Sequence, residues 1–393
     1  MNIERIHLKN FRAFYDVQLR DIPPLAVFVG ENGSGKSTLF QVFGFLKHAL
    51  QNNVSTALQT MGGYKEVATR GHVDEPIVID IRFRMVIAGS DRLVNYHLEI
   101  AEDASGLSFI KREILRYKRA RYGFPFHFLD FANGKGYAIS NEEDFSKPDR
   151  ELRKEPQSLD SRDILAIKGL GQFQRFKAAS AFRNLIENWH VSDFRIKAAR
   201  QRVEIGVAEH VSESGDNLPL VARHLYQHAP RTFEKILEKF RTRIPGMFEV
   251  TTKLTEDGHV LLRFKDNSFK DPFIARYVSD GTIKMFAYLL LLHDPEPHPF
   301  LCIEEPENQL YPSLLSVLVE ELRDYAMRGG QVFVSTHSPD VLNHVEIEEA
   351  FLLKKKDGKT SIRPLSANRQ VKTFIDGGDK LGWLWNHGLL ELQ

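Results

Sequence analysis

The pattern of hydrophobic and polar positions changes its period several times along the chain. Stretches that alternate, as strands with one buried face do, lie at 3–8, 16–19, 25–29, 77–87 and 93–100. A helical pattern at Leu39–Leu50 separates the third of these from the fourth, and two more short strands are expected between Leu107 and Ile139. The alternation in I-V-I-D-I-R-F-R-M-V-I (77–87) predicts an antiparallel sheet that is half buried.

The middle of the chain has a different character. Residues 161–240 are mostly helical in pattern, with a polar break at S-E-S-G-D-N (212–217). The stretch 249–264 then reads as a β-hairpin, with Asp257-Gly258 at its turn.

The final third returns to helices alternating with buried strands. A helix is expected after Thr282 and another at 314–327, and buried strands are expected at 300–303 and 331–336. Pro339 opens a further helix. Two α/β segments with a different middle predict one nucleotide-type sheet that carries a large insertion.

The composition is that of an ordinary globular protein. Of 393 residues, 42% are hydrophobic and 27% are charged, and a net charge of +1 neither requires nor excludes nucleic acid. The apolar run at 285–292 is too short to cross a bilayer, and the charged N-terminus has no signal-peptide core. Cys302 is the only cysteine, so no intramolecular disulfide can form. We expect a cytoplasmic protein that does not engage a membrane.

Residues 30–38, G-E-N-G-S-G-K-S-T, fit the P-loop pattern and lie between a predicted strand and a predicted helix. Backbone N–H groups of such a loop converge on a phosphate, and the helix N-terminus adds partial positive charge. Lys36 would reach the β- and γ-phosphates of ATP, and the Ser37 hydroxyl would be a Mg²⁺ ligand. The residues expected to bind ATP here are Asn32, Gly33, Ser34, Gly35, Lys36, Ser37 and Thr38.

Acidic residues end the buried strand in P-F-L-C-I-E-E-P-E-N (299–308). This position is the carboxyl edge of the sheet, where open α/β sheets bind ligands. We expect Glu304 to face Mg²⁺, directly or through water, and Glu305 to polarise the attacking water as the catalytic base. His337 ends the next strand, in S-T-H-S-P, and would hydrogen-bond the γ-phosphate or orient the water.

These motifs in this order resemble the ATP-binding-cassette (ABC) superfamily, in the branch with the RecF and SMC proteins and the overcoming-lysogenization-defect (OLD) nucleases. The chain is most similar to stand-alone bacterial predicted ATPases of the AAA_21 type. The resemblance implies an α/β fold: an ABC-type P-loop ATPase head with an antiparallel β-subdomain and a largely helical insertion between two lobes. The expected divisions are an N-terminal lobe at 1–110, the insertion at 111–270 and a C-terminal lobe at 271–393.

Further roles follow from this resemblance. In L-K-N-F-R-A-F (8–14), Arg12 matches an arginine that approaches the nucleotide phosphates. In V-S-D-G-T, the residues Ser279, Asp280 and Gly281 match the signature motif, which binds the γ-phosphate of ATP held by the opposite subunit. Ser279 is also a good N-cap for the helix behind it, and the two roles are compatible.

Other parts of the resemblance are less specific. The stretch E-E-P-E-N-Q-L-Y-P matches Walker B and the D-loop, with Glu304 where transporters carry aspartate. The tail G-D-K-L-G-W-L-W (378–385) is similar to the end of these predicted ATPases. The family's Q-loop glutamine is not placed; Gln157 and Gln172 are candidates, and neither is assigned.

Three stretches combine basic and aromatic residues, at 111–124, 173–177 and 194–202. Such residues could neutralise phosphates and stack on bases, or they could form a solvated amphipathic face. OLD-type nucleases carry a Toprim domain after the ATPase, but only 56 residues follow His337 here, and one cysteine cannot supply a zinc-ligand cluster. We therefore expect any nuclease or toxin to be a separate effector protein encoded nearby.

The sequence thus predicts an ATP- and Mg²⁺-dependent ATPase that works as a homodimer or higher homo-oligomer. Nucleotide state would control its engagement of DNA or of the effector, in DNA maintenance or in defence against phage and plasmids. The alternative is a nucleotide-gated scaffold with little turnover.

Overall fold

The computed structural model describes residues 2–87, 89–118, 125–140 and 151–391. The chain forms two compact units: unit 1 is Met1–Trp189 with Ala350–Ala367, and unit 2 is His190–Glu349 with Asn368–Gln393. Both units are therefore built from segments that are distant in sequence. These units are groups of segments that pack together, and they do not correspond to the expected lobes. The lobe boundaries expected at 110/111 and 270/271 therefore stay a prediction.

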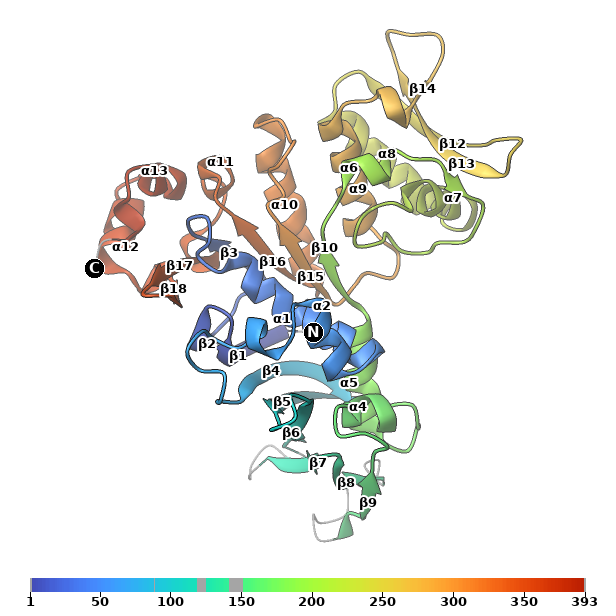
Figure 1. The fold of residues 1–393 in the computed structure, drawn as a ribbon. Coiled ribbons are helices and arrows are strands. Elements are labelled where there is room, and N and C mark those ends of the chain that lie inside the picture. The colour runs from blue at the N-terminus through green and yellow to red at the C-terminus, as the bar shows by residue number, and fades with distance from the viewer. Residues whose placement is uncertain (1, 88, 119–124, 141–150, 392–393) are drawn as a thin grey trace. The chain divides into compact units, whose positions relative to one another are not determined.

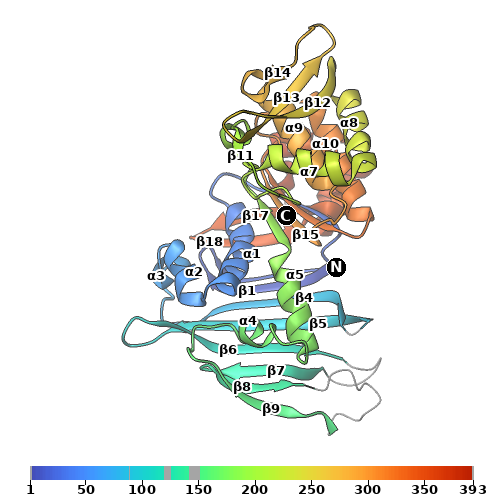
Figure 2. The ribbon, with the colours of Figure 1, turned by 90° about the vertical axis from the view of Figure 1, so that its right-hand side faces the viewer.

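Unit 1 contains a large antiparallel sheet with strand order β2-β1-β4-β5-β6-β7-β8-β9 (Figures 1 and 2). Its strands are β1 (Asn2–Phe11), β2 (Phe14–Arg20), β4 (Ile77–Ile87), β5 (Ser90–Glu102), β6 (Ser108–Tyr117), β7 (Phe126–Ala132), β8 (Lys135–Ile139) and β9 (Lys154–Ser158). The alternating stretches predicted the first four. Between 107 and 139 the prediction of two strands was wrong, since the described residues there form β6, β7 and β8.

Helices cover one face of this sheet. They are α1 (Lys36–Gln51), α2 (Val54–Thr60), α3 (Tyr64–Val67), α4 (Ala166–Leu170) and α5 (Lys177–Glu187). Figure 2 shows α5 crossing β4 and β5, where Phe182 stacks on Phe83 with ring centroids 4.9 Å apart. On the other face, Asp80 of β4 accepts hydrogen bonds from Arg5 and Asn95, so the predicted alternation separates an apolar face from a charged one.

A second group of strands in unit 1 carries the P-loop. Strand β3 (Leu25–Val29) pairs in parallel with β17 (Ala350–Lys356), which pairs with β18 (Lys359–Pro364) in an antiparallel hairpin. The sequence analysis did not identify this hairpin. Its turn is Asp357-Gly358. Both residues have positive φ (50° and 78°), as a two-residue hairpin turn of type I′ requires.

Unit 2 has the α/β order expected for the final third. Strands β10 (Trp189–Ser192), β15 (Phe300–Glu304) and β16 (Gln331–Thr336) are neighbours, and β15 and β16 run parallel. The helices of this part are α9 (Asp280–Leu292), α10 (Ser313–Met327), α11 (Pro339–Leu342), α12 (Arg369–Asp376) and α13 (Leu381–Asn386). Pro339 does begin a helix, but it is a single turn.

The rest of unit 2 is helical with one small sheet. The elements are α6 (Ile196–Ala199), α7 (Leu218–His228), α8 (Pro230–Arg243), β11 (Val203–Glu204), β12 (Met247–Leu254), β13 (His259–Asp266) and β14 (Phe273–Ile274). The predicted hairpin is confirmed, because β12 and β13 pair around the turn that contains Asp257-Gly258. In the described part of the chain no helix is both long and apolar enough to span a membrane.

Candidate functional site

The P-loop of unit 1 joins the fully buried strand β3 to α1. Gly33 and Gly35 have φ values of 77° and 104°, a region that favours glycine. A Cβ atom at Gly30 would lie 2.7 Å from the Leu353 backbone oxygen, so the neighbouring strand β17 is too close for a side chain there. The motif glycines therefore have a local structural cause, and they place the N-terminus of α1 at the loop.

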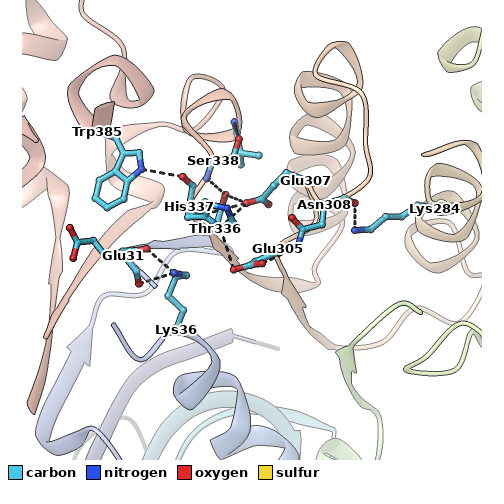
Figure 3. Close-up of polar contacts among 12 residues, drawn as sticks. Glu31, Lys36, Lys284, Glu305, Glu307, Asn308, Thr336, His337, Ser338 and Trp385 are labelled. Carbon is cyan, nitrogen blue, oxygen red and sulfur yellow. Dashed lines mark hydrogen bonds and ion pairs between the residues drawn. The ribbon is translucent and has the colours of Figure 1, made fainter. Parts of the chain in front are cut away.

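Lys36 lies over this loop and is buried. Its Nζ donates hydrogen bonds to the carbonyl oxygens of Gly30 (2.7 Å) and Glu31 (3.1 Å) (Figure 3). Ser37 and Asn32 are exposed, as binding of a phosphate or a hydrated cation requires. The ammonium group is thus held above the loop that the motif assigns to phosphates.

Two further contacts fix the loop within unit 1. Thr360 of β18 donates from Oγ1 to the Ser34 carbonyl (2.8 Å), and its backbone N–H donates to Ala13 O (2.7 Å). Arg12 donates to Gln41 Oε1 of α1 (2.6 Å) and to Met61 O (3.1 Å). Arg12 therefore contacts the helix that follows the P-loop, and its approach to phosphate stays a prediction.

Unit 2 brings Glu305 and His337 together at the ends of β15 and β16 (Figure 3). His337 Nδ1 lies 3.2 Å from Glu305 Oε1, and Asn308 Nδ2 donates to Glu305 Oε2 at 2.9 Å. Glu305 has a φ of 42°, an uncommon conformation for a non-glycine residue. Both oxygens of the Glu305 carboxylate are thus oriented by side chains. These come from His337, 32 positions away in sequence, and Asn308, 3 positions away.

Several residues of this cluster were missed by the sequence analysis. Glu307 Oε1 accepts from Thr336 Oγ1 (2.6 Å) and from the His337 backbone N–H (3.3 Å). Trp385 of α13 donates from Nε1 to the His337 carbonyl (3.1 Å). A third glutamate in E-E-P-E was a signal for Glu307, but nothing in the local sequence indicated Trp385.

Glu304 is the last residue of β15 and is half buried; in the parallel register it stands opposite Ser335. Among the described residues, no group of three or more His, Cys, Asp or Glu side chains could hold a metal ion. Mg²⁺ in nucleotide sites usually keeps several waters and takes one or two protein oxygens plus phosphates. The Ser37 hydroxyl of unit 1 and the Glu304 carboxylate of unit 2 each offer an oxygen of this kind, and their assignment as Mg²⁺ ligands stays a prediction.

The signature residues begin α9, as the sequence predicted. Ser279 is the N-cap, and its Oγ accepts from the Thr282 N–H (3.2 Å). Asp280 forms an ion pair with Arg200 (2.5 Å), and a Cβ at Gly281 would lie 2.9 Å from Gln309 O. Ser279 itself is exposed, so its capping role leaves it accessible to a ligand.

Lys284, one turn further along α9, is a buried lysine to which the sequence analysis assigned no role. Its Nζ donates to Asn308 O (2.7 Å), and burial lowers its pKa to about 8 although Glu307 and Glu305 oppose the shift. Because Asn308 also contacts Glu305, α9 is joined to the Glu305 cluster through two hydrogen bonds.

The basic stretches are largely paired within the fold. Arg112 contacts Asp130 (2.8 Å), and Arg202 contacts Asp257 (2.7 Å). Arg175 lies over the ring of Phe176 (4.8 Å). Positions 119–124 of the first stretch lie outside the described residues. These contacts favour the amphipathic-face interpretation over a dedicated nucleic-acid surface.

The two candidates for the Q-loop glutamine are Gln157, on β9, and Gln172, before α5. Gln157 is on β9, at the opposite edge of the large sheet from β2, whose Phe14 lies beside Gly35. Seven strand spacings of about 4.8 Å separate these edges by roughly 34 Å. Gln157 therefore cannot serve the P-loop of its own unit, and Gln172 is exposed in the loop before α5.

Comparison with known proteins agrees with this fold. The family model AAA_21, described as "AAA domain, putative AbiEii toxin, Type IV TA system", matches residues 25–343. A solved SmcHead bound to the C-winged helix domain of ScpA is 14% identical, with a TM-score of 0.55 over 92% of this chain and 97% of that one. An Smc head domain with an extended coiled coil, bound to the C-terminal domain of ScpA and derived from Pyrococcus furiosus, is 13% identical, with a TM-score of 0.54 over 96% and 99%.

At such identities the solved structures establish the fold alone, and that fold is the SMC head. It confirms the expected α/β head fold with an antiparallel sheet. The expected insertion at 111–270 contains the strands β7 to β13 as well as helices. The family model covers most of the chain, including the P-loop, the signature and the Glu305 cluster. The chain therefore belongs to the AAA_21 family and has the fold of an SMC head.

Proposed function

We propose that this protein hydrolyses ATP slowly and uses the nucleotide to close and open a dimer. The observation that carries the proposal is the Glu305 carboxylate, held by His337 at one oxygen and Asn308 at the other. A carboxylate so oriented keeps free lone pairs that can accept a proton from an attacking water. The backbone of Glu305 is in the left-handed region (φ 42°), which for residues other than glycine is often found at functional sites.

The remaining residues take the roles that their positions suit. Lys36 and the N–H groups of residues 32–38 bind the phosphates, Arg12 approaches them, and His337 orients the water beside Glu305. Ser37 and Glu304 would hold Mg²⁺, which would supply positive charge to offset that of the nucleotide phosphates. The exposed Ser279 and the N-terminus of α9, with Asp280 and Gly281, bind the γ-phosphate of ATP held by a second copy of the chain.

The output of the cycle is engagement of a partner. The pairing of Arg112 and Arg202 with acids leaves less free positive charge for DNA, and this favours a separate effector protein. The Smc heads were solved with domains of ScpA, which supports a protein partner. A cytoplasmic role in DNA maintenance or phage defence fits these features.

The test is steady-state hydrolysis by the Glu305→Gln variant. Loss of a general base costs roughly 10²–10⁴-fold, so we expect turnover to fall at least about 100-fold while ATP still binds. Lys36→Ala should instead lose ATP binding, and exposed Glu348→Gln should match the wild type. Wild-type turnover in Glu305→Gln would refute the catalytic assignment.

The alternative function is a nucleotide-gated scaffold with little turnover that holds the effector until ATP is released. The distance of Gln157 from the P-loop favours it, because one glutamine candidate for the Mg²⁺ sphere is removed. Tight ATP binding by the wild type without measurable phosphate release, with or without duplex DNA, would establish this alternative.

A further inference from the structure

The C-terminal stretch G-D-K-L-G-W-L-W has no role in the function above, yet it packs against the His337 loop. Helix α13 lies beside α11, which begins two residues after His337 (Figure 1). A Cβ at Gly382 would lie 1.9 Å from Pro339 O, so only glycine allows the two backbones to approach this closely. The Gly382 N–H also donates to Asn343 Oδ1 (3.1 Å).

Burial of apolar side chains already explains why α13 docks. Leu381 and Leu384 are 2% and 0% exposed, and burial of their side chains stabilises the docked helix whether or not Trp385 makes a hydrogen bond. Trp385 is only half buried, so its indole N–H could be hydrated in many orientations. It points instead at one carbonyl, that of His337, at 3.1 Å (Figure 3).

That hydrogen bond completes the restraint of one residue. The His337 backbone N–H donates to Glu307, and its carbonyl accepts from Trp385. With both ends of the residue held, the imidazole is directed at Glu305, 3.2 Å away. Because the backbone of His337 is held on both sides, its imidazole keeps its orientation toward Glu305 during the reaction.

We propose that Trp385 is a positioning residue, and that α13 is a brace that holds His337 against Glu305. The inference rests on the proposed function in taking His337 and Glu305 as the catalytic pair. Trp385 acts only through His337, and it contributes to the rate of hydrolysis rather than to ATP binding.

The first test is the Trp385→Phe variant, which keeps an aromatic ring but removes the donor. One hydrogen bond is worth about a five- to tenfold change, so kcat should fall by about that factor while KM for ATP stays within about twofold. Trp383→Phe makes the same substitution on the exposed side of α13 and should behave as the wild type. Wild-type kcat in Trp385→Phe, or an equal loss in Trp383→Phe, would overturn the proposal.

A double-mutant cycle separates positioning from general stability. In a His337→Ala background, Trp385→Phe should cause no further loss, because the residue it positions is gone. A repeated five- to tenfold loss would show that Trp385 acts on the fold at large. If Glu305→Gln and His337→Ala both kept wild-type turnover, the proposed function would fail before the brace was at issue.

Exchange of the indole protons tests the contact without any activity. The chain has three tryptophans, so its ¹H–¹⁵N spectrum has three indole signals, which the single Trp→Phe variants assign. The Trp385 proton should exchange with solvent more slowly than that of exposed Trp383. Equal exchange rates would mean that the hydrogen bond to His337 does not persist, and the brace would be rejected.

Discussion

Glu113 shows how one buried side chain can make the fold sensitive to pH. Its carboxylate accepts hydrogen bonds from the backbone N–H groups of Ala166 and Ile167 and from the Tyr96 hydroxyl, which join β6 and β5 to α4. Burial raises the pKa of Glu113 to about 7, because it disfavours the charged form more than these donors favour it.

We therefore predict that unfolding depends on pH through this residue. The folded state keeps the proton until about pH 7, whereas the unfolded chain releases it near 4.5, so stability from Glu113 is present below 4.5 and is lost as pH rises through 7. The stability of the wild type relative to Glu113→Gln should fall by roughly 1–3 kcal/mol over this range. Denaturant unfolding of both proteins measures it.

The matched control is Glu66→Gln, at an exposed glutamate of the same unit. It should leave the pH profile of unfolding unchanged. A constant difference between the wild type and Glu113→Gln from pH 4.5 to 7.5 would show that Glu113 does not titrate in this way.

At this scale the sequence predicts a residue when its role is set by its neighbours in the chain. Gly33, Gly35 and Lys36 belong to a motif whose spacing encodes the loop conformation itself, and Ser279 was predicted as an N-cap from the helix that follows it. The contacts of Glu307, Lys284 and Trp385 could not be predicted in this way, although the third glutamate of E-E-P-E was a signal for Glu307. Their partners lie 24 to 48 positions away, and only the folded strands and helices bring them together.

The β17–β18 hairpin is the element on which the P-loop depends within unit 1. Thr360 of β18 is buried, and it donates to the Ser34 carbonyl from Oγ1 and to Ala13 O from its backbone. The loop is therefore held by a hairpin more than 320 residues away in sequence. The sequence analysis missed this hairpin, and nothing in the local sequence indicates its contact with the P-loop.

Thr360→Val should weaken ATP binding without unfolding the protein. The valine keeps the shape but leaves the buried Ser34 carbonyl without its donor, at a cost of roughly 1–3 kcal/mol. We expect the loop to loosen and the Kd for ATP to rise at least about threefold, as measured by calorimetry. Ser361→Ala removes an exposed hydroxyl from the same strand and serves as the control; unchanged affinity in Thr360→Val would show that the hairpin does not tune the loop.

Over the whole molecule, the motifs are divided between two units. The P-loop and Arg12 belong to unit 1, and the signature, Glu304, Glu305 and His337 belong to unit 2. The order of motifs predicted the ATPase head at an identity to the solved Smc heads of only 13–14%. The prediction was possible because the P-loop and the acidic residues at strand ends have fixed places in open α/β sheets. The insertion has no comparable motif, so the protein's binding partner could not be predicted from it.

The most direct test of the account is the light-scattering mass of the Glu305→Gln variant with and without ATP and Mg²⁺. The account predicts that ATP doubles the 45.1 kDa mass of the chain. Adding Ser279→Arg should abolish the doubling, whereas Ser268→Arg, the same change at an exposed serine of unit 2, should not. A mass that ignores ATP, or a doubling that survives Ser279→Arg, would contradict the ATP-held dimer.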